Sequence, residues 1–119
     1  MADATTTLAT LKDAVRQFAV EREWEPFHSP KNLSMGLAIE AAELMEQFLW
    51  IEGDASRQVV GDPAKLSEVA DEMADVANYL LNLSNALGID LSQAIVDKIA
   101  KNAVKYPVEK FRGRYRAEE

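Results

Sequence analysis

Residues 37–50 read Leu-Ala-Ile-Glu-Ala-Ala-Glu-Leu-Met-Glu-Gln-Phe-Leu-Trp, and residues 69–81 read Val-Ala-Asp-Glu-Met-Ala-Asp-Val-Ala-Asn-Tyr-Leu-Leu. In both segments apolar residues recur at steps of three and four, which is the period of an α-helix. Each helix carries two adjacent apolar stripes, at 37/41/44/48 and 38/42/45/49 in the first and at 69/73/76/80 and 70/74/77/81 in the second. One partner helix cannot cover two stripes in so small a chain, so the pattern predicts a homo-oligomer.

Capping and turn residues predict four helices, over about residues 6–22, 32–51, 62–87 and 90–106. Asp62-Pro63 reads as the start of the third helix and Gly88 as its stop, and Gln93 is placed for a capping-box contact with Asp90. The expected fold is an all-α four-helix bundle. We expect one domain over residues 1–119, with an ordered core of about 6–107 and a charged tail from Glu109 that frays.

The composition excludes several classes of protein. With 48% hydrophobic residues in 119, the chain is expected to fold rather than to be disordered. It has no cysteine, which excludes disulfides, zinc thiolates and thiol nucleophiles. A net charge of -7 argues against a nucleic-acid polymer as partner, but not against a small phosphorylated ligand held through a metal. Met1–Thr7 lacks the features of an export signal and no stretch could span a membrane, so we expect a cytoplasmic protein.

Two pairs of carboxylates lie on the two middle helices. Glu40 and Glu43 are three residues apart and share one helical face, and Glu72 and Asp75 repeat the arrangement on the next helix. An antiparallel turn between the helices would bring the four side chains to one place. The simplest alternative is a solvated acidic face, since charged residues are mostly exposed.

No positively charged residue lies near these carboxylates along the chain, because residues 32–56 and 66–97 contain no Lys or Arg. A solvated acidic face usually carries basic residues four positions from Glu. Like charges gathered in one place repel unless a cation lies among them. Oxygen ligands predict Mg²⁺, with Mn²⁺ also possible. A di-iron bundle uses Glu-x-x-His on two helices, and no histidine lies on any expected helix, which disfavours that class.

Aromatic residues follow both carboxylate pairs. Trp50 lies seven residues beyond Glu43, and Tyr79 lies seven residues beyond Glu72. Each step is about 10.5 Å along the helix axis. This layout would hold a metal-bound phosphate at one end and a stacked base at the other. Trp24 and His28, in the loop between the first two helices, would complete the base pocket. Packing in the core or an interface is the alternative for the rings, and a surface position is the alternative for His28.

The fourth expected helix offers a basic face, formed by Lys98, Asn102 and Lys105. Lysine is a plausible phosphate contact. A solvated helix face explains these residues almost equally well.

The pattern Glu40-x-x-Glu43 followed by Glu72-x-x-Asp75 resembles the signature of the MazG-type all-α nucleoside triphosphate pyrophosphohydrolases. Residues 21–25 (Glu-Arg-Glu-Trp-Glu), 27–33 (Phe-His-Ser-Pro-Lys-Asn-Leu) and 105–107 (Lys-Tyr-Pro) are similar to the dCTP pyrophosphatase branch of that family. The resemblance extends over about residues 8–112. It departs at Val15, where dCTP-preferring relatives carry histidine, and this leaves the base preference open.

The resemblance implies a Mg²⁺-dependent enzyme in which water attacks the α-phosphorus of a (deoxy)nucleoside triphosphate and pyrophosphate leaves. It implies dCTP or a modified pyrimidine as substrate and a tetramer, with a dimer as the alternative. The implied metal ligands and catalytic residues are Glu40, Glu43, Glu72 and Asp75. The implied substrate contacts are Trp24, His28, Trp50 and Tyr79 for the base and Lys98 and Asn102 for the phosphates. The competing class is a non-catalytic helical module that binds metal or nucleotide.

Overall fold

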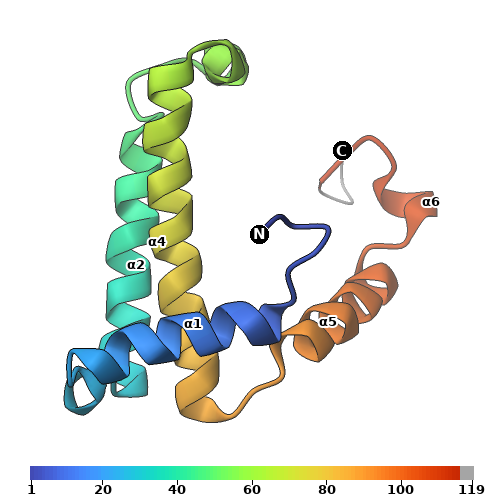
Figure 1. Cartoon of the computed structure of the whole chain (residues 1–119). Helices are drawn as coiled ribbons and strands as arrows, with labels where there is room; N and C mark the ends of the chain where they lie inside the picture. Colours follow the sequence, from blue (N-terminus) through green and yellow to red (C-terminus); the bar gives the residue numbers. More distant parts are fainter. Residues whose placement is uncertain (116–119) are drawn as a thin grey trace. The chain divides into compact units, whose positions relative to one another are not determined.

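The computed structural model describes residues 1–115, and these are helical with no strand among them. The helices are α1 (Leu8–Glu21), η1 (Glu25–Phe27), α2 (Pro30–Glu46), α3 (Gly53–Ser56), η2 (Arg57–Gly61), α4 (Pro63–Leu87), α5 (Leu91–Lys105) and α6 (Val108–Phe111) (Figure 1). The expected all-α class is therefore confirmed. None of these helices has the length and apolar character needed to cross a membrane. The contacts divide the chain into two compact units, Met1–Gly88 and the part from Ile89 onward.

The ends of α4 are set by local sequence, as expected. The Asp62 side chain accepts a hydrogen bond from the backbone N–H of Lys65 at 3.2 Å, and Pro63 occupies the first helical position. Gly88 ends the helix with φ 64°, a left-handed conformation that glycine adopts without steric cost. Local capping therefore explains why this helix of 25 residues begins and ends where the sequence predicts.

The second predicted helix is wrong at its C-terminal end, because α2 stops at Glu46 and not near Ile51. From Gln47 onward the backbone N–H groups bond to carbonyls three residues back, and these tighter turns take the chain off the α-helical path. The side chain of Gln47 accepts a hydrogen bond from Lys65 Nζ at 2.9 Å, a tertiary contact that holds the end of α2 against the first turn of α4. Gly53-Asp54, the expected stop, begins the short helix α3.

One further expectation about the C-terminal unit, the capping box at Asp90, needs correction. Asp90 caps α5 by accepting from the Gln93 N–H at 2.9 Å, but the Gln93 side chain donates to Asp97 and does not complete a capping box. The expected tail from Glu109 includes most of α6, and Phe111 makes an edge contact with Tyr106; that the tail frays stays a prediction. The rest of that prediction, for residues 116–119, falls outside the described part of the chain.

In the N-terminal unit α2 lies along α4, and α1 crosses the C-terminal part of α4 (Figure 1). Asn85 fixes this crossing with both ends of its amide. Its Nδ2 donates to the carbonyl of Lys12 at 3.0 Å, and its Oδ1 accepts from the Arg16 guanidinium at 3.0 Å. These bonds tie α1 to α4 and so define the groove between the two helices.

Candidate metal and nucleotide site

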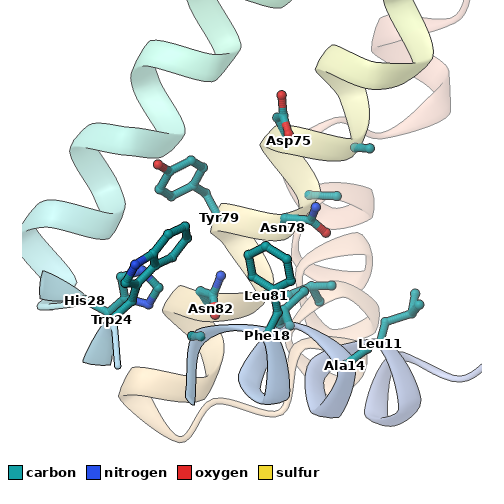
Figure 2. Close-up of a pocket in the computed structure, with 14 residues that line it drawn as sticks. Leu11, Ala14, Phe18, Trp24, His28, Asp75, Asn78, Tyr79, Leu81 and Asn82 are labelled. Carbon is teal, nitrogen blue, oxygen red and sulfur yellow. The ribbon is translucent and has the colours of Figure 1, made fainter. Parts of the chain in front are cut away.

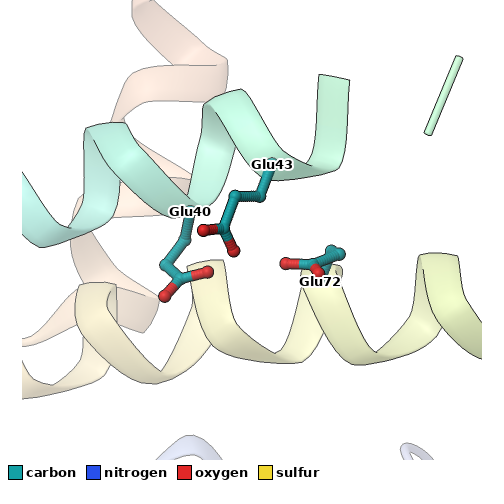
Figure 3. A group of neighbouring side chains, drawn as sticks. All are labelled: Glu40, Glu43 and Glu72. Carbon is teal, nitrogen blue, oxygen red and sulfur yellow. The ribbon is translucent and has the colours of Figure 1, made fainter. Parts of the chain in front are cut away.

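The carboxylate cluster is built by α2 and α4. Glu40 and Glu43 project from α2 toward Glu72 of α4 (Figure 3). One oxygen from each of the three side chains lies within 4.8 Å of the others. The three-residue spacing puts the α2 pair on one face, and the side-by-side packing of α2 and α4 brings the third carboxylate opposite.

The electrostatics of this cluster favour a bound cation. Desolvation by burial, and then the hydrogen bond and negative charge of Glu43, raise the pKa of Glu40 from 4.5 to about 7. Burial and the charge of Glu43 likewise raise the pKa of Glu72. The Oε2 atoms of Glu40 and Glu72 are shielded from solvent and have no hydrogen-bond partner in residues 1–115. Two orphaned carboxylate oxygens beside a third carboxylate form an oxygen-only donor set that fits a hard divalent ion such as Mg²⁺ or Mn²⁺.

Asp75 is set apart from the three glutamates. It is not within the 4.8 Å group, so the structure brings three of the four predicted ligands into mutual contact distance. Its charge still raises the pKa of both Glu40 and Glu72, and it lines the neighbouring cavity. Asp75 therefore stands between the carboxylate cluster and the cavity, where a ligand could contact both.

A cavity of about 570 Å³ lies in the N-terminal unit, between α1, α4 and the loop that follows α1. Its lining is mainly apolar, with the rings of Phe18, Trp24 and Tyr79 around it and His28 at its side (Figure 2). The Trp24 ring meets Phe18 edge to face at 5.7 Å and His28 at 6.4 Å between centroids. Three of the predicted base contacts, Trp24, His28 and Tyr79, are thus brought to one cavity.

The end of α1 explains how Trp24 reaches the cavity. The N–H of Trp24 donates to the Ala19 carbonyl at 3.0 Å and that of Glu23 to the Val20 carbonyl at 3.0 Å, the bond pair of a Schellman motif. Glu23 takes the left-handed position with φ 54°, which glycine usually fills. This reversal folds Trp24 back onto Phe18. The left-handed backbone of Glu23, which is unusual for glutamate, therefore positions the Trp24 ring in the wall of the cavity.

Tyr79 is held by a close approach of α4 to α2. A Cβ atom added at Gly36 would lie 2.7 Å from Cζ of the Tyr79 ring and 2.8 Å from Cδ1. We therefore expect Gly36→Ala to displace the ring and to raise KM for the nucleotide, because the cavity would lose its ordered wall. Steady-state kinetics check this, with Gly61→Ala as the control because a Cβ there meets nothing within 4 Å. An unchanged KM in Gly36→Ala would show that the Tyr79 position does not matter for binding.

One predicted substrate contact of the N-terminal unit, Trp50, is not brought to this cavity. Trp50 lies beyond the end of α2 and is 91% exposed, so the expectation that it shares a helical face with Glu43 is wrong. Lys98 and Asn102 lie on α5, in the unit from Ile89 onward. The roles of all three remain predictions.

The cavity also contains residues that the sequence patterns did not identify as site residues. α1 contributes Leu11, Ala14 and Phe18, which read only as the apolar face of an amphipathic helix. α4 contributes Asn78 and Asn82. Their spacing from Asp75, three and seven residues, places them on its face and was the available signal. Val15, the one departure from the resemblance, lines the cavity as well.

A family model described as the MazG-like family matches residues 36–117. The chain belongs to the MazG-like family. Among relatives, this MazG-like protein is 36% identical over 107 residues to dCTP pyrophosphatase 1 of Mus musculus and 35% identical over 102 residues to that of Homo sapiens. The matches cover 90% and 85% of the chain but only 63% and 59% of the two relatives. The crystal structure of a pyrophosphatase from Archaeoglobus fulgidus is similar to the MazG-like chain with a TM-score of 0.78 and 36% identity, over 90% of this chain and 98% of that one.

Proposed function

We propose that this MazG-like protein hydrolyses a (deoxy)nucleoside triphosphate, dCTP or a related pyrimidine nucleotide, to the monophosphate and pyrophosphate with Mg²⁺ as cofactor. One observation carries the proposal. A cluster of carboxylates with two buried, unpartnered oxygens lies next to a ring-lined cavity, with Asp75 at their junction. The names of the relatives, dCTP pyrophosphatase 1 and pyrophosphatase, support the same activity.

We propose the following roles for the residues of the site. Glu40, Glu43, Glu72 and Asp75 would hold the divalent cation, and the chemistry such an ion supplies is neutralisation of triphosphate charge and activation of water. One of these carboxylates would take the proton of the attacking water. Phe18, Trp24 and Tyr79 would enclose the base, and their apolar surfaces would exclude solvent from it. In the same proposal Lys98 and Asn102 contact the phosphates and Trp50 adds to the base pocket.

The competing function is a helical module that binds metal or nucleotide without turnover. The two are separated by measuring pyrophosphate release from each common dNTP and NTP with Mg²⁺, with EDTA as the metal-free control. We expect Mg²⁺-dependent release, with the highest kcat/KM for a pyrimidine deoxynucleotide. Binding without release would favour the module, and a strong purine preference would contradict the pyrimidine assignment.

We also propose that the protein forms a homo-oligomer, with a tetramer favoured over a dimer, and acts in the cytoplasm. In one of the two apolar stripes of α2, Leu37 and Leu44 are half-buried, whereas the other stripe, Ala38, Ala42 and Met45, is exposed, as is Leu49 beyond the end of the helix. Only four hydrophobic residues among 1–115 are buried, so much apolar surface is free to pack against other copies. The prediction is a mass of two or four chains by light scattering at micromolar concentration. A monomeric mass would contradict it, and Met45→Glu should reduce the mass of an oligomer built on this stripe.

A further inference from the structure

Three asparagines lie on one face of α4 at helical spacing: Asn78, Asn82 and Asn85. Of these three side chains, only that of Asn85 makes hydrogen bonds within the described residues that hold the fold together. Asn85 uses both ends of its amide to hold α1, through Lys12 and Arg16. The amides of Asn78 and Asn82 have no hydrogen-bond partner within residues 1–115. Both line the ring-lined cavity, and in Figure 2 Asn82 lies between the rings of Trp24 and Phe18.

The positions of Asp75 and Asn82 along α4 define the two ends of the cavity. Asp75 marks the end next to the carboxylate cluster, and Asn82 lies seven residues further, about 10.5 Å along the helix axis. Asn82 is half-buried and also lines an adjoining cavity of about 260 Å³, together with polar residues that include Arg16, Glu25 and His28. The apolar cavity therefore ends in polar groups at the end remote from the carboxylates.

A nucleotide whose phosphates lie at the carboxylates would place its sugar and then its base along this axis. The part of a pyrimidine furthest from the sugar is the exocyclic group at position 4, which is an amino group in cytosine and an oxo group in uracil and thymine. We propose that the Asn82 amide is a specificity-determining residue that hydrogen-bonds this 4-position group; this inference rests on the proposed function.

The Asn82 amide can both donate and accept a hydrogen bond, and this determines which pyrimidines it can bind. The carbonyl oxygen of asparagine accepts from an amino group, and its NH₂ donates to an oxo group. Because none of residues 1–115 bonds to the Asn82 amide, it can rotate to satisfy either group, whereas the amide of Asn85 is fixed by its two bonds. We expect the parent protein to accept both 4-amino and 4-oxo pyrimidines, so its substrate class is broader than cytosine nucleotides alone.

The test is the ratio of kcat/KM for dCTP to kcat/KM for dUTP in the parent and in Asn82→Asp. A carboxylate only accepts, so it keeps the bond to the cytosine amino group and repels the uracil oxo group. We expect Asn82→Asp to raise the ratio at least about tenfold. The two substrates carry identical triphosphates, so any general effect of the added negative charge cancels in the ratio.

Asn78→Asp is the matched control, because it puts the same charge on the same face of α4 one turn closer to Asp75. There we expect the ratio to stay within about threefold of the parent value. An unchanged ratio in Asn82→Asp, or an equal rise in Asn78→Asp, would overturn the proposal. Asn82→Leu adds a variant without charge: both substrates should lose about tenfold in kcat/KM, and no loss for either would also overturn it.

A binding measurement separates this inference from the proposed function. The affinities for dCTP and dUTP are measured calorimetrically with Ca²⁺ in place of Mg²⁺, for the parent and for Asn82→Asp. If the parent shows no turnover but Asn82→Asp weakens dUTP binding more than dCTP binding, the proposed activity fails and the role of Asn82 stands. If turnover is present and neither ratio moves, the activity stands and the role of Asn82 fails.

Discussion

Replacing Glu72 by Gln is expected to lower kcat by about 10²–10⁴-fold while the helices remain folded. Glu72 is the α4 member of the cluster, and its oxygen lies within 4.8 Å of both α2 glutamates. The amide has nearly the same shape, so packing between α2 and α4 is preserved. The negative charge that would hold a divalent cation and accept a proton is lost, and pyrophosphate release at saturating nucleotide and Mg²⁺ measures the effect.

Glu68→Gln is the matched control for this substitution. Glu68 lies four residues earlier on α4 and is exposed, and its one ion pair within the described part of the chain is with Lys65 at 3.9 Å. Its replacement should leave kcat within about twofold of the parent value, since an exposed ion pair contributes little. Circular dichroism shows whether either variant has lost helix. A Glu72→Gln variant that is folded and turns over within threefold of the parent would remove the carboxylate cluster from the catalytic machinery.

Without divalent metal, the protein is expected to become less stable as the pH rises from about 5 to about 8. The folded-state pKa of Glu40 is about 7, well above its ordinary value of 4.5, because burial and then Glu43 disfavour its charged form. Between these two values the folded state holds a proton that the unfolded state has released. The stabilisation is fully present below about 4.5 and is lost as the pH rises through about 7. The pKa of Glu72 is raised and contributes in the same direction.

Melting temperatures in EDTA across this pH range measure the effect. Glu40→Gln, which cannot ionise, should show a shallower fall than the parent and should melt higher at pH 8. Mg²⁺ should raise the melting temperature of the parent more at pH 8 than at pH 5, because ionised carboxylates bind it better. Glu68→Gln should follow the parent curve. Equal slopes for the parent and Glu40→Gln would show that the cluster carries no buried, uncompensated charge.

The amino-acid sequence determined the parts of this protein that depend on neighbours a few residues apart. The helical period of the apolar residues predicted the all-α class, and Asp62 and Gly88 fixed the ends of α4 through bonds to the adjacent turn. The spacing of Glu40 and Glu43 placed both carboxylates on one face of α2. Each of these features follows from the geometry of a single helix and needs no knowledge of the rest of the chain.

Tertiary structure decided the features that depend on residues far apart in the chain. The bond between Lys65 and Gln47 secures the turn that ends α2 early, and this turn takes Trp50 off the face assigned to it. The packing of α2 on α4 brings the carboxylates of Glu40, Glu43 and Glu72 together, while Asp75 lines the cavity. Asn82 and Asn85 are the same residue type on one helix, yet Asn85 reaches α1 and bonds to it while Asn82 faces the cavity. Helical periodicity places both asparagines on the same face of α4. Only the crossing of α1 over α4 decides that Asn85 bonds to α1 and that Asn82 is available to bind a ligand.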